Sequence, residues 1–288
     1  MNYQHAFHAG GFADVFKHAV LCRILEHLRA KPAAFRVLDT HAGAALYDLT
    51  SEEARRGNEW QDGIGKLMAA ALPDEARALL APYLDAIRAL NPGGALTLYP
   101  GSPALVRAAL RAQDRLIACE LEPKAGAALA HHLRRDARIK TLAIDGWTAL
   151  SAYLPPKERR GLVLVDPPFE QDNDFGRLAE GLALAHRKWA TGIFMLWYPI
   201  KGRPEPDLLA KRLRRFGIAK ILRAELIVSP LSDPTRLNGS GLILVNPPWT
   251  LEAELGQLLP LLARLMARQG KGAFTLDWLV GEAPVGSR

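Results

Sequence analysis

Hydrophobic residues near the start of the chain recur at steps of three and four, the spacing of one face of a helix. The pattern runs over 12–31 and stops before Pro32, which predicts an amphipathic helix. The apolar run at 35–39 predicts a strand. Small residues at 40–45 follow this strand directly, and such a turn lets the backbone approach a ligand.

Further apolar runs alternate with helical patterns along the rest of the chain. They span residues 115–120, 139–144, 161–165, 192–197, 221–229 and 241–245, and a basic helix is expected at 207–216. With the first strand they make seven strands. Strands that alternate with helices predict an α/β, Rossmann-like fold with a mostly parallel sheet.

One interval interrupts this alternation. About 75 residues separate the turn at 40–45 from the acid that ends the next strand, whereas a simple crossover needs roughly 30. Helical patterns fill the interval, and Asn91-Pro-Gly-Gly94 closes them. We therefore expect a small helical subdomain at 50–96, inserted into a main domain made of 1–49 and 97–288. Ser102 is a candidate cap for the helix that follows.

Carboxylates stand at the carboxyl ends of four predicted strands: Asp39, Glu120, Asp145 and Asp166. The second can bind the ribose hydroxyls of a nucleoside, the third can hold an adenine amino group, and the turns with Gly43 and Gly146 can admit an amino-acid group. This order suits S-adenosylmethionine as the cofactor. The first turn alone fits an ordinary strand-to-helix connection equally well, because it lacks further glycines.

The most specific pattern is Asp166-Pro-Pro-Phe169. Its prolines remove two backbone donors and fix φ, so the Asp166 carboxylate and the Pro167 carbonyl form a rigid pair of acceptors. Such a pair can bind both hydrogens of the exocyclic amino group of adenine, and Phe169 offers a ring for a flipped-out base. The motif predicts methyl transfer to that nitrogen. The alternative is a rigid turn with an apolar plug.

A second loop, Asn246-Pro-Pro-Trp249, has the same pattern. The seventh strand in methyltransferase sheets of this kind runs antiparallel to its neighbours, so this loop is expected at the opposite edge of the sheet. Ligands collect at the carboxyl ends of the parallel strands. We therefore interpret it as a structural turn.

Composition adds a weak preference for a polyanionic partner, since 37 Lys+Arg against 30 Asp+Glu give a formal charge of +7. The basic pairs could bind phosphate or form solvated helix faces: Arg134-Arg135, Arg159-Arg160, Lys211-Arg212 and Arg214-Arg215. Cys22 and Cys119 have no zinc spacing, which favours a reducing compartment. We expect a cytoplasmic protein without signal peptide or membrane span.

The histidines at 5, 8, 18 and 41 could be imagined as a metal cluster, but no confirming pattern of acids or cysteines accompanies them. Hydrogen-bonding roles are favoured, and no metal is expected. Trp197-Tyr198 after the fifth strand could line a base pocket or belong to the core.

Several motifs together resemble one known family. The chain is similar to the ribosomal large-subunit (23S) RNA adenine-N6 methyltransferase J family in Tyr3-Gln-His-Ala-Phe-His-Ala-Gly10, Ala13-Asp-Val-Phe-Lys-His18, Leu38-Asp-Thr-His-Ala-Gly43, Tyr99-Pro-Gly-Ser-Pro103, Asp166-Pro-Pro-Phe169 and Leu196-Trp-Tyr-Pro199. The resemblance runs nearly end to end and includes the helical insertion.

This resemblance implies a class I S-adenosylmethionine-dependent fold and a set of site residues. Cofactor contacts are implied for His18, His41, Ser102, Glu120, Asp145, Gly146 and Asp166, and RNA contact for Tyr3. Asp166 would also accept the proton. Two positions depart from the family: Phe169 stands where tyrosine is frequent, and Ala44-Ala45 where another glycine is common.

The expected activity is therefore transfer of a methyl group to N6 of an adenine in 23S ribosomal RNA, either free or in an assembly intermediate, by a monomer. A DNA adenine-N6 methyltransferase stays open, because the four-residue loop does not distinguish sugars. A non-catalytic RNA-binding assembly factor is the other alternative, although the acceptor and cofactor carboxylates are all present.

Overall fold

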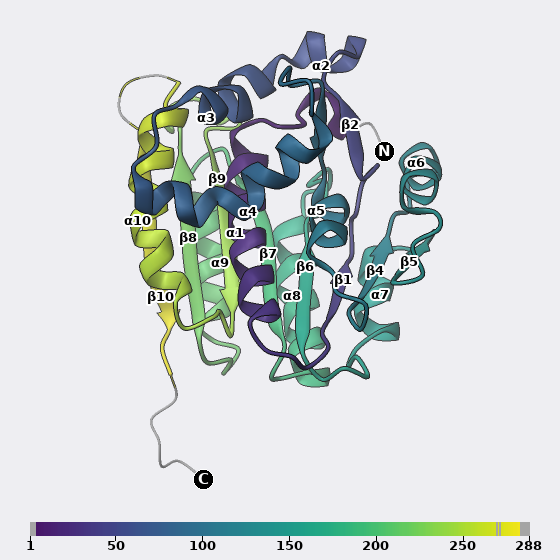
Figure 1. The fold of residues 1–288 in the computed structure, drawn as a ribbon. Helices are drawn as coiled ribbons and strands as arrows, with labels where there is room; N and C mark the ends of the chain where they lie inside the picture. The colour runs from purple at the N-terminus through teal and green to yellow at the C-terminus, as the bar shows by residue number, and fades with distance from the viewer. Residues whose placement is uncertain (1–3, 269, 271, 283–288) are drawn as a thin grey trace.

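An eight-stranded sheet forms the centre of the protein, in the order β10-β8-β9-β7-β6-β1-β4-β5 (Figure 1). The structure is a computed structural model that describes residues 4–268, 270 and 272–282. The strands are β1 (Arg36–Asp39), β4 (Arg115–Cys119), β5 (Ile139–Leu142), β6 (Gly161–Val165), β7 (Ile193–Ile200), β8 (Ile221–Ile227), β9 (Gly239–Val245) and β10 (Ala273–Val280).

The directions of these strands confirm the predicted topology. The first five in the chain, β1 and β4 to β7, pair in parallel, and β9 lies antiparallel between β7 and β8. The predicted number of seven strands was wrong, because β10 adds an eighth at the edge, antiparallel to β8. Phe274 and Trp278 are 44% and 37% exposed, so this edge strand lacks the continuous apolar run of a buried one.

Helices cover both faces of the sheet because alternate side chains of its buried strands point to opposite sides. In β6, Leu162 and Leu164 join the hydrophobic core on one face, whereas Val163 and Val165 join the core on the other. Figure 1 shows the first face under α1 (Phe12–Arg29), α4 (Asp74–Leu90), α5 (Ser102–Ala109) and α10 (Leu251–Met266). The second face carries α7 (Gly146–Ala152), α8 (Asp174–Lys188) and α9 (Pro204–Leu213), and α6 (Pro123–Leu133) lies beside β5.

The segment expected to be helical is helical. It contains α2 (Glu52–Gly57), a π-helical turn η2 (Gln61–Gly65), α3 (Lys66–Ala69) and α4. A pair of short strands that the sequence analysis missed, β2 (Leu46–Asp48) and β3 (Leu98–Pro100), brackets it. α4 packs against α1 and α10 (Figure 1). The division into a main domain and a subdomain at 50–96 stays a prediction.

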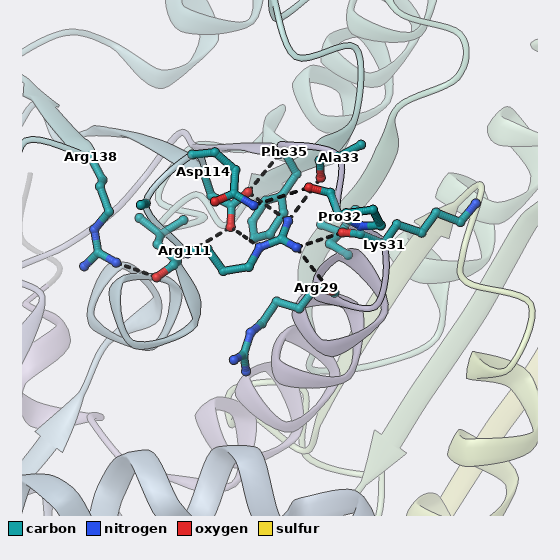
Figure 2. Close-up of polar contacts among 12 residues, drawn as sticks. Arg29, Lys31, Pro32, Ala33, Phe35, Arg111, Asp114 and Arg138 are labelled. Carbon is teal, nitrogen blue, oxygen red and sulfur yellow. Dashed lines mark hydrogen bonds and ion pairs between the residues drawn. The ribbon is translucent and has the colours of Figure 1, made fainter.

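A partly buried ion pair, in which Asp114 is 0% and Arg111 is 23% exposed, fixes the carboxyl end of α1 (Figure 2). The Arg111 guanidinium donates to both carboxylate oxygens of Asp114, at 2.8 and 3.1 Å. It also donates to the carbonyls of Arg29, Lys31 and Ala33, at 3.2, 2.8 and 3.1 Å. The Arg29 carbonyl ends the helix, where carbonyls lack helical partners, so the guanidinium supplies a donor there and ties the loop that follows to Asp114.

Among the residues that the structure describes, no helix is both long and apolar enough to cross a membrane.

Candidate active site at the carboxyl edge of the sheet

The parallel strands bring the predicted carboxylates to one edge of the sheet. In register, Asp39 at the end of β1 lies beside Ala118 of β4 and Leu164 of β6. Glu120 and Asp166 follow those two strands directly, and Asp145 comes three residues after β5, the next strand along. Because β6, β1, β4 and β5 are consecutive in the sheet, the four acids line one rim.

Glu120 holds the turn after β1. One of its carboxylate oxygens accepts the Gly43 N–H at 2.8 Å, and the other accepts the Glu122 N–H at 2.8 Å. Gly43 has φ +63°, and a Cβ there would lie 2.3 Å from the Tyr47 hydroxyl oxygen, so glycine is required. Ala45 has φ +69°. The turn thus keeps the left-handed conformation that glycine favours and bears its strain.

The turn after β5 packs tightly against the turn after β1. A Cβ on Gly146 would lie 2.2 Å from the Thr40 carbonyl oxygen and 2.7 Å from the His41 ring, so only glycine permits this approach. Asp145 caps α7 by accepting the Thr148 N–H at 3.1 Å. Burial lowers the pKa of His41 to about 4, so its ring is neutral at pH 7.

Asp39 is fully buried and only half satisfied. Its Oδ2 accepts a hydrogen bond from the Ser102 hydroxyl at 2.7 Å, and its Oδ1 has no partner within the described residues. Burial raises the pKa of Asp39 to about 7, against the opposing effect of the Ser102 hydrogen bond. The prediction that Ser102 caps α5 was wrong. Gly101 is the capping position, and the Ser102 hydroxyl donates its hydrogen bond to Asp39 instead.

Asp166 is held by a lysine from α1. Lys17 Nζ lies 2.5 Å from Asp166 Oδ2 and 2.9 Å from Asp14 Oδ1. The lysine side chain is 5% exposed and the Asp166 side chain 15%. Burial opposes the charge of Lys17, but the two carboxylates outweigh it and raise its pKa. The ammonium therefore stays charged and fixes the carboxylate at the end of β6.

Asp14 is the hub of this cluster. Besides Lys17 it accepts the Gly10 N–H at 3.0 Å, and His5 Nε2 lies 2.9 Å from its Oδ2. Burial alone would raise the pKa of Asp14. The nearby histidines and Lys17 outweigh burial and hold this pKa well below its usual range. His18 Nε2 faces Asp14 Oδ1 at 4.0 Å.

His18 is 1% exposed, and its Nδ1 lies 2.7 Å from the Tyr99 hydroxyl. Its ring therefore lies in the hydrophobic core. The cofactor contact implied for His18 stays a prediction.

Phe169 stands in a strained aromatic cluster. Its φ is +50°, which a phenylalanine rarely adopts. The ring packs edge-on against Phe175, with centroids 4.9 Å apart, and against Trp197, at 5.6 Å. Trp197 thus supports the site, whereas Tyr198 is fully buried in the core. Strain of about 1–3 kcal/mol at such a position needs packing to hold it, and these rings supply that packing.

The second Pro-Pro loop lies at the opposite edge, as expected. Val245 at the end of β9 pairs with Phe194 and Ile221, which are near the starts of β7 and β8. Asn246 donates to the carbonyls of Ala190 and Gly192, each at 2.8 Å. The loop is therefore a structural turn remote from Asp166.

The basic pairs named in the sequence analysis also lie near the starts of strands. They precede β5, β6 and β8, so a phosphate-binding surface there would be remote from Asp166. Arg160 instead donates to the carbonyls of Leu28 and Ala33.

Sequence reasoning missed Lys17 and Asp14 as functional residues. Both lie in α1, which is buried nearly all round, so a charged pair at i and i+3 in that helix was the available signal. Tyr3 lies outside the described residues. Among the described residues, no group of three or more histidine, cysteine or acidic side chains gathers to hold a metal ion.

Comparison with known proteins shows which family this chain belongs to. A family model described as "Ribosomal RNA large subunit methyltransferase D, RlmJ" matches residues 32–280. The chain belongs to this family. It is 39% identical over 284 residues to "Ribosomal RNA large subunit methyltransferase J" of Haemophilus influenzae, and 41% identical over 282 residues to the Escherichia coli protein of the same name. Each match covers 98% of this chain and 100% of the relative.

A solved structure from the same comparison supports the fold. The crystal structure of protein LPL1258 from Legionella pneumophila shares 32% identity and superposes with a TM-score of 0.86, covering 94% of this chain and 98% of that one. The RlmJ family is one of S-adenosylmethionine-dependent methyltransferases.

The rim fits that cofactor. The unpartnered Asp39 Oδ1 can accept a donor, and the glycines at 43 and 146 let the turns after β1 and β5 pack closely at this rim. Glu120 uses each carboxylate oxygen once, so lone pairs remain for ribose hydroxyls.

Proposed function

We propose that this protein transfers a methyl group from S-adenosylmethionine to N6 of an adenine in 23S ribosomal RNA. One observation carries the proposal: the Asp166-Pro-Pro-Phe169 loop ends β6 at the rim of strand-end carboxylates, with Asp166 pinned by Lys17 at 2.5 Å. The names of the relatives, which are large-subunit ribosomal RNA methyltransferases, support the RNA substrate.

The loop supplies the acceptors for the amino group. The carboxylate of Asp166 accepts one N6 hydrogen and the carbonyl of Pro167 the other, which leaves the nitrogen lone pair free to attack. Lys17 occupies one side of the carboxylate and prevents it from rotating. After transfer the amino nitrogen is positively charged, and Asp166 takes its surplus proton or passes it to water. Phe169 stacks on the base, held by Phe175 and Trp197.

Residues along the rim would hold the cofactor, which supplies an activated methyl group when bound. Glu120 binds the ribose hydroxyls, Asp145 and Gly146 the adenine, and the turn with His41 the amino-acid part, beside Ser102. His18 and Asp166 complete the proposed contacts. Tyr3 is proposed to meet the RNA, and the helical segment 50–96 is proposed to form a subdomain of a cytoplasmic monomer.

Incubation with labelled S-adenosylmethionine and either protein-free 23S ribosomal RNA or DNA tests the proposal. The purified protein is expected to label the RNA. Asp166→Ala should lower the single-turnover rate by at least about 100-fold, because it removes both an acceptor and the proton-accepting group.

Asn246→Ala, in the matching loop at the other edge, is the control and should keep the wild-type rate. Labelling of DNA alone, or an Asp166→Ala protein that transfers methyl groups at the wild-type rate, would contradict the proposal.

A further inference from the structure

A buried row of polar side chains leads away from Asp166 into the core. Lys17 joins Asp166 to Asp14, and Asp14 Oδ1 faces His18 Nε2 at 4.0 Å. Asp14, Lys17 and His18 lie in helix α1 at positions i, i+3 and i+4, so they share one face of this helix. The row does not end at His18.

Two phenols continue the row to helix α4. The Tyr99 hydroxyl, on β3, lies 2.7 Å from His18 Nδ1, and the Tyr83 hydroxyl, on α4, lies 2.8 Å from that of Tyr99. Both tyrosines are 0% exposed, and the rings of His18 and Tyr99 stack with centroids 5.6 Å apart. Within the described part of the chain, Tyr83 makes no other side-chain hydrogen bond. The row therefore starts in segment 50–96 and ends at Asp166.

The protons of this row can be arranged in two directions. Burial lowers the pKa of His18 to about 3, so its ring is neutral and carries one N–H. If Nδ1 carried it, Tyr99 would donate to Tyr83, the Tyr83 proton would have no acceptor, and the Nε2 lone pair would face the Asp14 carboxylate.

The opposite direction avoids the repulsion. Tyr83 donates to Tyr99, Tyr99 donates to His18 Nδ1, and the Nε2–H points toward the Asp14 carboxylate 4.0 Å away. Among the described residues, each direction leaves one polar hydrogen without a hydrogen-bond acceptor, so the charge of Asp14 decides between them: it attracts the Nε2–H and repels a lone pair, and this direction is favoured.

We propose that Tyr99, supported by Tyr83, is a positioning residue for the active site: its hydroxyl fixes the His18 tautomer that orients Asp14, and Asp14 holds Lys17 on Asp166. The inference rests on the proposed function of Asp166 as acceptor. It also gives segment 50–96 a role, because Tyr83 comes from its longest helix.

Removing the Tyr99 hydroxyl breaks the row at its centre. In Tyr99→Phe the Nδ1 position loses its donor, and the proton can move to Nδ1, where the Nε2 lone pair repels Asp14. Asp14 and Lys17 then shift, and the carboxylate of Asp166 loses its fixed position. Small displacements of a reacting group lower the rate of the chemical step more than they lower binding.

Nitrogen NMR of protein labelled with ¹⁵N-histidine tests the first half. The His18 signals are identified by their loss in His18→Gln. In the wild type, the proton is expected on Nε2, and in Tyr99→Phe at least part of it moves to Nδ1. A wild-type His18 protonated on Nδ1 overturns the proposal without any reference to activity.

Steady-state kinetics with ribosomal RNA test the second half. Tyr99→Phe is expected to lower kcat about tenfold and to leave KM for RNA within about twofold. Tyr83→Phe keeps the Tyr99–His18 bond, so we expect a kcat loss of about threefold, and the double variant should be no slower than Tyr99→Phe.

The control is Ile87→Val, a fully buried apolar change one turn after Tyr83 on the same helix. It loosens the packing of α4 without touching the hydroxyls, and its kcat should equal that of the wild type.

Unchanged kcat in Tyr99→Phe overturns the proposal, as does a loss in Ile87→Val equal to that in Tyr99→Phe. If Tyr99→Phe does not fold, unchanged kcat in Tyr83→Phe decides against it. A wild-type protein that does not methylate RNA instead contradicts the proposed function.

Discussion

At the scale of single residues, the site depends on buried charges whose partners come from distant parts of the chain. Lys17 and Asp166 are 149 positions apart and lie 2.5 Å from each other. Both Lys17 and Asp14 are at most 5% exposed, so each needs the other: a buried charge without its partner is strongly destabilising. Asp39 differs, because one of its oxygens has no partner among the described residues.

Because Asp39 is buried and half satisfied, we expect the free energy of unfolding of the cofactor-free protein to depend on pH. Its pKa of about 7 lies above the ordinary 3.8, so between these values the folded state binds more protons than the unfolded state. The free energy of unfolding contributed by Asp39 therefore falls as the pH rises from about 4 to about 7.

Asp39→Asn removes this titration and still accepts from Ser102. Its unfolding free energy, relative to the wild type, should rise by up to about 2.5 kcal/mol between pH 5 and pH 8 in urea titrations, because about two pH units of the titration fall in this window. Asp74→Asn, on a 95% exposed side chain, is the control. A difference between Asp39→Asn and the wild type that is the same at both pH values would contradict the burial argument.

At the scale of elements, helix α1 joins the site to the rest of the fold. Its first half carries Asp14, Lys17 and His18 to the rim, and its carboxyl end is bound by Arg111 (Figure 2). Asp114, at 0% exposure, completes the ion pair. Burial alone would raise the pKa of Asp114, but hydrogen bonds from Arg111 and from the Phe35 N–H lower it below its usual value. The pair therefore stabilises the fold at neutral pH and is lost in acid.

Arg111→Met leaves the Asp114 carboxylate buried without its ion-pair partner. We expect the free energy of unfolding at pH 7 to fall by about 3 kcal/mol in urea titrations. The loss should shrink as the pH falls through the lowered pKa of Asp114, because the wild type loses the pair there.

Arg88→Met tests an exposed pair of the same spacing, since Arg88 and Asp85 are 56% and 67% exposed. It should change stability by less than about 1 kcal/mol. An equal loss in both arginine variants would show that the contacts around Arg111 contribute no more than a surface pair.

At the scale of the whole molecule, the sequence predicted the parts that follow from periodicity. Apolar runs ending in Asp39, Glu120 and Asp166 predicted a parallel sheet with these acids at one rim, because parallel strands end on the same side. The position of Asn246 at the other edge was predicted from the antiparallel seventh strand of methyltransferase sheets, and β9 has this direction. Neither inference needed knowledge of how side chains pack.

What the sequence did not predict depends on packing between distant elements. The contact of Lys17 with Asp166 follows from how α1 lies across the sheet, which no local pattern encodes. The left-handed Ala45 and Phe169 are held by their surroundings against their own preference. The edge strand β10 was missed because its side chains are half exposed.

We propose that the Asp166 loop directs methyl transfer to the exocyclic nitrogen of adenine in ribosomal RNA. The most direct measurement is nucleoside analysis, by chromatography and mass spectrometry, of 23S ribosomal RNA methylated by the purified protein. We expect N6-methyladenosine as the methylated product, and its absence when Asp166→Ala is used. Methylation of cytosine, guanine or a ribose hydroxyl, with no N6-methyladenosine, would contradict the account.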